Sequence, residues 1–303
     1  MMDIEAVYSD CTLCPRNCHA DRLHGQRGYC GMDSTVRAAR AALHMWEEPC
    51  ISGKKGSGAV FFTGCCLRCC YCQNRSIAIG SEGLEITTER LADIFLELQE
   101  KGAANINLVT GVHYVPSIIR ALDIAKRGGL RLPVVYNSSG YEKPETLKLL
   151  EGYVDIYLPD FKYSDDKLAE QYSKAPDYPK VVKAAIEEMV RQTGSCEFDE
   201  TGYIKKGTIV RHLILPGHTK NSVKILEYLH NTYENDIFIS IMNQYTPVYV
   251  QEKYAELNRR VTKREYSKVL DAAYNLGIEN GFFQEGRTAS ESFIPSFDYE
   301  GIR

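Results

Sequence analysis

The sequence predicts an α/β fold, a partial (β/α)6 barrel of the TIM type with a cysteine-rich N-terminal extension. From residue 58 onward, apolar runs alternate with helical stretches, which is typical of βαβ units and a parallel sheet. The sequence contains six such runs, fewer than the eight strands of a closed barrel. Ten of the eleven cysteines lie between Cys11 and Cys72. An open doubly wound sheet is the alternative fold, because periodicity alone does not separate the two.

Each apolar run is expected to form one strand. The six runs cover residues 58–64, 105–111, 132–139, 154–160, 208–217 and 237–246. Between them, 87–102 and 115–129 carry apolar residues at spacings of three and four, which indicates helices. We therefore expect three parts: the extension at 1–54, the barrel at 55–290 and a C-terminal tail at 291–303.

Polar side chains collect where the predicted strands end. They include Thr110, His113, Asn137, Ser138, Ser139, Asp160, Lys162, His218, Asn243 and Gln244. Cys65 also follows the first strand. Barrels and open α/β sheets both form their active sites at the C-terminal strand ends. The pattern therefore predicts an enzyme with one polar mouth.

Composition excludes several classes of protein. The formal net charge is -4 and no Lys/Arg-rich run occurs, so we expect no nucleic-acid partner. No apolar stretch approaches the roughly 18 residues of a membrane span. The start, MMDIEAVYSDC, lacks the basic and apolar regions of a signal peptide. We expect a cytoplasmic protein without a membrane partner, in which clustered cysteines indicate metal or redox chemistry rather than disulfides.

The stretch GCCLRCCYCQN packs five cysteines into eight positions. Cys66, Cys69 and Cys72 begin a ferredoxin signature, which needs a fourth cysteine three residues later, before a proline. Ser76 stands there instead, so that interpretation fails. The other set starts at Cys65 and has the spacing C-x3-C-x2-C. Three thiolates on a cubane cluster leave one iron open for a substrate or cofactor, as an open position does on catalytic zinc.

This spacing, with Tyr71 directly before the last cysteine, resembles the radical S-adenosylmethionine (radical SAM) superfamily. The cluster ligands that the resemblance implies are Cys65, Cys69 and Cys72. It further implies a [4Fe-4S] cluster, S-adenosylmethionine on the open iron with Tyr71 against the adenine, and a one-electron donor such as flavodoxin or ferredoxin. Cys66 and Cys70 fall outside the pattern. A zinc knuckle is the alternative, but it needs a fourth ligand nearby, and the next histidine is His113.

Further stretches resemble the pyruvate formate-lyase activating enzyme-related proteins. They are NSSGYE, VDIYLPDFKY, VRHLILPG and MNQYTP. Activating enzymes proper take hydrogen from a backbone glycine, so the resemblance implies a glycyl-radical enzyme as partner. DFK resembles their D-x-K element and makes Asp160 and Lys162 candidates to contact the methionine group of the cofactor. Arg211 matches their arginine-containing strand, and Asn137 and Ser139 are further cofactor-binding candidates.

Three departures from that group bear on the substrate. The acidic GGE-type motif is absent, and VTGVH stands after the second strand. The element Asp-Thr-Asn-Gly is replaced by Asn137-Ser138-Ser139-Gly140. The histidine expected after the sixth strand is replaced within MNQYT. We therefore expect an uncharged cofactor site, and a small molecule or peptide is the alternative substrate. A second alternative is a non-catalytic iron–sulfur or zinc protein.

The extension carries its own cysteine motif, CTLCPRNCHADRLHGQRGYCG. Cys11, Cys14, Cys18 and Cys30 are spaced C-x2-C-x3-C-x11-C. Four thiolates suit a zinc ion or an iron–sulfur cluster equally. Cys50 could replace one member of the set. The motif predicts a second metal site of either kind.

Overall fold

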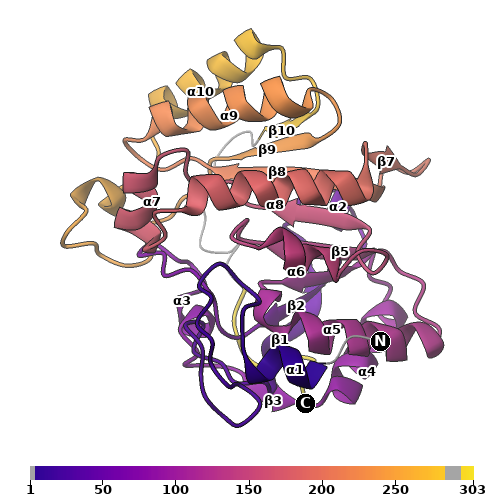
Figure 1. Ribbon diagram of the computed structural model, residues 1–303. Coiled ribbons are helices and arrows are strands. Elements are labelled where there is room, and N and C mark those ends of the chain that lie inside the picture. Colours follow the sequence, from indigo (N-terminus) through magenta and orange to yellow (C-terminus); the bar gives the residue numbers. More distant parts are fainter. Residues whose placement is uncertain (1–3, 284–294) are drawn as a thin grey trace.

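The computed structural model describes residues 4–283 and 295–303 (Figure 1). The boundary expected at 290/291 lies outside the described residues. The described strands form one sheet in the order β10-β9-β8-β6-β5-β4-β2-β1-β3, and β7 pairs with β8. The strands are β1 (Val36–His44), β2 (Ser57–Phe62), β3 (Leu84–Ile86), β4 (Ile106–Val109), β5 (Val134–Ser138), β6 (Ile156–Pro159), β7 (Glu197–Phe198), β8 (Ile204–Leu213), β9 (Phe238–Met242) and β10 (Gly281–Phe283).

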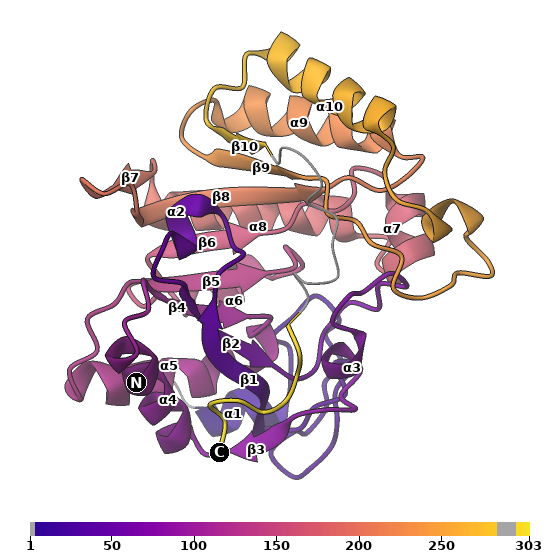
Figure 2. The same cartoon turned by 180° about the vertical axis from the view of Figure 1, so that it is seen from behind.

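Helices connect the strands. They are α1 (Ile4–Ser9), α2 (Pro49–Ser52), α3 (Arg75–Ala78), α4 (Thr88–Glu100), α5 (Val115–Arg127), α6 (Pro144–Lys148), α7 (Asp166–Ser173), α8 (Tyr178–Thr193), α9 (Thr219–Tyr233) and α10 (Lys263–Leu276), with the 3-10 turns η1 (Val112–Tyr114) and η2 (Ala255–Asn258). Helices α5, α6 and α8 lie in front of the strands in Figure 1, and the opposite view brings the strands forward (Figure 2). Every helix within the described chain is too short or too polar to span a lipid bilayer.

The six predicted strands correspond to β2, β4, β5, β6, β8 and β9. They are parallel and lie side by side in chain order. A doubly wound sheet would reverse its order at a switch point, and this sheet does not. The prediction of a partial (β/α)6 barrel is therefore confirmed, and the doubly wound alternative is wrong.

The strand register aligns the C-terminal ends that we expected to form a mouth. Val109 of β4 pairs with Asn137 of β5, and Asn137 pairs with Leu158 of β6. Just beyond β6, Asp160 forms a bridge with Arg211 of β8. Neighbouring strands thus end side by side, and the residues that follow them meet above the sheet.

The extension also contributes to the sheet. Strand β1 lies antiparallel to β2, and β3 lies antiparallel to β1. The stretch VRAARAALH that forms β1 is rich in alanine, which has a weak preference for strands, so sequence reasoning missed it. Strand β1 belongs to the same sheet as the barrel strands. The domain boundary expected after residue 54 stays a prediction.

Apolar packing fixes the barrel on both sides of the mouth. One core cluster packs β2, β4 and β5 against α4 and α5. A second cluster joins the cysteine-rich loop after β2 to α7, α8, β8, β9 and α9. The cysteine-rich loop therefore rests on well-packed structure.

Candidate active site

The cysteine-rich loop between β2 and α3 is held by distant parts of the chain. From the extension, Arg16 Nε donates to the Cys66 carbonyl oxygen at 2.9 Å. The Cys70 amide donates to the Tyr172 carbonyl oxygen of α7 at 2.8 Å. From near the other end, Gln251 Nε2 donates to the Cys70 carbonyl oxygen at 2.8 Å. The loop takes its shape from all three segments.

Three of the five clustered cysteines face one cavity. Cys65, Cys69 and Cys72 line a cavity of about 150 Å³ at the C-terminal strand ends, and the last two also line an adjoining one of about 230 Å³. Within the described chain, Cys66 and Cys70 line neither. The structure thus separates the C-x3-C-x2-C set from the two remaining cysteines.

Hydrogen-bond donors lie against two of these three sulfurs. The Leu67 amide donates to Cys65 Sγ at 3.4 Å, and Ser173 Oγ donates to Cys69 Sγ at 3.0 Å. A further hydrogen bond from the Cys66 thiol lowers the pKa of Cys65 to about 7. Donors to sulfur stabilise thiolates and tune the clusters that thiolates hold. The donor set therefore fits a cysteine-ligated iron–sulfur cluster.

Tyr71 lies between the larger cavity and this sulfur network. It lines the cavity of about 230 Å³, and its hydroxyl is 2.7 Å from that of Tyr163. Tyr163 is in turn 2.7 Å from Ser173 Oγ. The Tyr71 ring packs edge-on against the rings of Tyr172 and Tyr245, with centroid-to-centroid distances of 6.3 and 6.0 Å. A ring fixed in this way offers a flat wall to a planar ligand.

Four predicted cofactor-binding residues form one ionic network. Arg211 Nε donates to Asp160 Oδ1 at 2.9 Å, and Arg211 Nη2 donates to Asn137 Oδ1 at 2.6 Å. Lys162 Nζ donates to Asp160 Oδ2 at 2.6 Å. The side chains of Lys162 and Asp160 are only 17% and 18% exposed, so this ion pair is largely buried. The structure brings these four residues together beside the cysteines.

Within this network the ionised forms of Asp160 and Lys162 are favoured. Burial disfavours the carboxylate of Asp160, but Arg211 and Lys162 outweigh that effect and hold its pKa below the ordinary value. Burial also disfavours the ammonium of Lys162, and Asp160 reverses that effect, which leaves the pKa of Lys162 raised. The mouth therefore holds fixed charges in a largely dry setting, where they act strongly on a ligand.

Sequence reasoning missed Glu47, which completes the network. It follows β1 and accepts from Arg211 Nη1 through Oε2 at 2.9 Å. Its Oε1 accepts from Asn137 Nδ2 at 3.1 Å and from Asn107 Nδ2 at 3.2 Å. The expectation of an uncharged site is wrong, because the extension places a carboxyl group beside Asn137. The adjacent acids in WEEPC were the only signal, and no spacing relates them to a strand end.

The other polar residues of the strand ends divide between the mouth and the outer packing. Ser139 and Thr110 line the cavity of about 150 Å³. Thr110 has φ +61°, a conformation that is strained for a β-branched residue and common at functional sites. His113 lies away from the cavity, with Nε2 2.7 Å from the Thr63 carbonyl oxygen. His218 also lies outside the mouth, with Nε2 2.8 Å from the Tyr172 hydroxyl.

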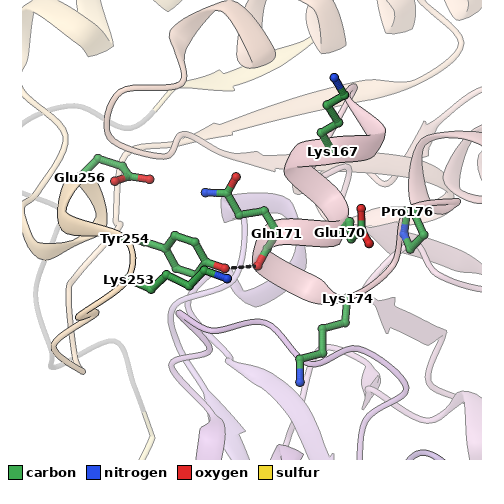
Figure 3. A pocket seen from close by; sticks show the side chains of 8 residues that line it. All are labelled: Lys167, Glu170, Gln171, Lys174, Pro176, Lys253, Tyr254 and Glu256. Atoms are coloured by element: carbon green, nitrogen blue, oxygen red, sulfur yellow. Dashed lines mark hydrogen bonds between the residues drawn. The ribbon is translucent and has the colours of Figure 1, made fainter.

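A larger hollow lies outside this mouth, between α7 and the segment around η2 (Figure 3). Its volume is about 840 Å³, and its lining residues are Lys167, Glu170, Gln171, Lys174, Pro176, Lys253, Tyr254 and Glu256. The Tyr254 hydroxyl donates to the Gln171 carbonyl oxygen at 2.9 Å. Its lining contains neither a cysteine nor any predicted cofactor-binding residue. The smaller cavities at the strand ends are therefore the better candidate site.

Of the four cysteines of the extension, Cys14 contacts the loop. The Cys14 thiol is hydrogen-bonded to that of Cys66. Cys50 is separate from them, because it lies in α2 and packs in an apolar cluster with Ile51 and Ile156. Among residues 4–283 and 295–303, no three His, Cys, Asp or Glu side chains form a group that could hold a metal ion as they stand.

The fold and cavity define an α/β-barrel protein with three cysteines at the mouth of a parallel sheet. The family model of the radical SAM superfamily matches residues 59–229, more than half of the chain. The chain belongs to this superfamily. Membership implies a [4Fe-4S] cluster, S-adenosylmethionine and an electron donor.

Individual relatives narrow the assignment less than the family model does. An uncharacterized protein of Methanocaldococcus jannaschii is 28% identical over 284 residues, which cover 90% of this chain and 77% of the relative. The solved structure of Streptococcus suis SuiB bound to S-adenosylmethionine is 16% identical, with a TM-score of 0.47 over 73% of this chain and 48% of SuiB. SuiB bound to its precursor peptide SuiA is 13% identical, with a TM-score of 0.47 over 74% and 47%. The aligned part of this chain thus spans about half the length of SuiB.

Proposed function

We propose that this protein is a radical SAM enzyme in which Cys65, Cys69 and Cys72 hold the [4Fe-4S] cluster. The observation that carries the proposal is that these three thiols line the cavity at the strand ends, whereas Cys66 and Cys70 do not. When bound, the cluster supplies the electron that cleaves S-adenosylmethionine to methionine and a 5′-deoxyadenosyl radical, which takes hydrogen from a substrate.

The residues around the cavity have separate roles in binding the cofactor. Tyr71 provides the wall for the adenine. Lys162 meets the carboxylate of the methionine group, with Asp160 holding its ammonium at 2.6 Å. Arg211 and Asn137 fix Asp160 and the strand ends around it. Because these side chains are already paired, the site needs little rearrangement to receive the ligand.

The cysteine assignment predicts unequal effects within the loop. Changing Cys65, Cys69 or Cys72 to Ala should abolish the absorbance of the cluster and the reductive cleavage of S-adenosylmethionine. The matched control, Cys70→Ala, should keep both, and Cys66→Ala, which removes a hydrogen bond to Cys65 and no ligand, should keep the iron. Iron analysis and chromatography of 5′-deoxyadenosine measure the two properties. If Cys66→Ala were as damaging as Cys65→Ala, the assignment would be wrong.

The finer proposal is a glycyl-radical activating enzyme, on the strength of the resemblance to the pyruvate formate-lyase activating enzyme-related proteins. Among the described strands, the sheet ends in β10 and β3 and does not close, which favours a substrate too large to be enclosed, such as a loop of another protein. The test is incubation with a glycyl-radical enzyme, and electron paramagnetic resonance should show a glycyl doublet. Cofactor cleavage without a doublet would favour the small-molecule or peptide alternative.

The proposed setting is the cytoplasm, with flavodoxin or ferredoxin as donor. The clustering of cysteines between Cys11 and Cys72 supports a compartment where thiols stay reduced. Reduction by purified flavodoxin or ferredoxin, followed by the yield of 5′-deoxyadenosine, tests the donor.

A further inference from the structure

The extension contains a buried arginine that has no carboxylate partner among the residues that the structure describes. The side chain of Arg22 is 0% exposed. It donates to the carbonyl oxygens of Met32, His113 and Asp33 at 3.2, 2.6 and 2.5 Å. Its Nη1 also lies 3.6 Å from Cys11 Sγ. Three of these acceptors are backbone carbonyl oxygens and the fourth is a free thiol, so none of them carries a full negative charge.

Such a charge is costly to bury. Removing a guanidinium from water carries a large free-energy penalty, which a buried ion normally recovers from an opposite charge. The rings of Tyr8 and Tyr114 lie 4.9 and 5.7 Å from the guanidinium carbon of Arg22, but a cation–π contact offsets only part of the cost of burying a full charge. Within the described part of the chain, Arg22 therefore lacks a full negative charge to balance its own.

Three cysteines of the extension, Cys11, Cys18 and Cys30, lie near this arginine. A side chain on Gly28 would meet Cys18 Sγ at 3.0 Å, Cys30 Sγ at 3.6 Å and Arg22 Cδ at 4.0 Å. Both sulfurs thus lie against one glycine, beside the arginine. These contacts therefore place Cys11, Cys18 and Cys30 around Arg22 and Gly28. The thiol of the fourth member of the motif, Cys14, is hydrogen-bonded to Cys66 of the neighbouring loop.

We propose that Cys11, Cys14, Cys18 and Cys30 form a second, thiophilic metal centre, a zinc ion or an iron–sulfur cluster, with Arg22 as its buried counter-charge. Free thiols are neutral near pH 7, whereas metal-bound cysteines are thiolates. Metal binding therefore supplies the negative charge that Arg22 lacks. The Arg22-to-Cys11 contact becomes a charge-assisted hydrogen bond to a ligand sulfur, which is the usual support around a thiolate site. The sulfurs must draw closer than they stand in the structure.

The first test removes the barrel cluster from the full-length chain. A triple Ala variant at Cys65, Cys69 and Cys72 should retain about one zinc ion, or the iron of about one cluster, per chain. Metal analysis and visible absorbance distinguish the two metals. Adding Cys30→Ser should release that metal, and adding Cys196→Ser as the matched control should not. A folded triple variant without metal would overturn the proposal.

The second test needs no variant. Cys18 is exposed, so burial does not protect its thiol from an alkylating reagent. In the wild-type protein as isolated, with its metal, Cys18 should resist iodoacetamide and become labelled after metal is removed by a chelator, as mass spectrometry of its peptide reports. Full labelling of Cys18 in metal-loaded protein would remove Cys18 from the ligand set and refute the four-cysteine centre.

Discussion

Replacing Glu47 by glutamine tests the ionic network at the mouth most directly. The carboxylate accepts from three donors, Arg211 Nη1, Asn137 Nδ2 and Asn107 Nδ2. A glutamine fits the same space but presents one amide NH2 in place of an acceptor oxygen. Whichever way the amide turns, at least one donor then faces another donor.

The neighbouring side chains cannot rearrange to remove this clash between donors. The Asn107 amide could rotate, because its Oδ1 has no partner in the described structure. The Asn137 amide is fixed, since its Oδ1 accepts from Arg211 at 2.6 Å. The new NH2 must therefore oppose either Asn137 or the guanidinium of Arg211. Arg211 keeps Asp160 as a counter-charge, so the loss is smaller than that of a fully unpaired ion.

The expected cost is about 3 kcal/mol, the lower end for removing one partner of a buried ion pair and above the loss of one neutral hydrogen bond. That is a large part of the 5–15 kcal/mol by which domains are stable. Urea unfolding followed by circular dichroism measures it. Glu200→Gln, at an exposed turn residue, should change stability by less than about 0.5 kcal/mol. If Glu47→Gln matched this control, the carboxylate would not hold the network.

Three further changes test the site and its support. Lys162→Ala should weaken S-adenosylmethionine binding in calorimetry and leave the iron content intact; unchanged affinity would remove its role. Ser173→Ala deletes the donor to Cys69 Sγ and should make the midpoint potential of the cluster more negative by on the order of tens of millivolts, because that bond favours the more negative reduced form; Ser195→Ala at the surface should not. Burial lowers the pKa of His212 to about 4, below its unfolded value of about 6.5. As pH falls from 6.5 to 4, the unfolded state binds its proton first, so stability should drop by about 1.4 kcal/mol per unit from this group; His212→Gln should flatten that slope, and an unchanged slope would exclude the effect.

Sequence reasoning was sufficient for the barrel because the governing signals are local. Most residues of the six predicted strands are buried, so each strand reads as a short apolar run, and chain order sets strand order. The alternation of Arg211 and His212 follows from the pleat of one strand. Arg211 points into the mouth, whereas the imidazole of His212 is buried behind it, 2.7 Å from the Phe161 carbonyl oxygen.

The features that sequence reasoning missed depend on long-range contacts. Glu47 acquires its role from Arg211, which is 164 residues away. Arg22 is notable only because the fold buries it between the extension and the backbone of His113. Strand β1 carries too few β-branched residues to reveal itself and is formed by pairing with β2. In each case the residue type is ordinary, and only the fold gives it a special environment.

The contacts around the cysteine-rich loop set an order for making the holoprotein. The loop is held by Arg16, by Tyr172 and by Gln251. A ribosome releases the chain N-terminus first, so Gln251 becomes available only when most of the protein has been synthesised. Until then the Cys70 carbonyl lacks one of its partners. We expect the iron–sulfur assembly machinery to act on the finished chain rather than on the nascent one.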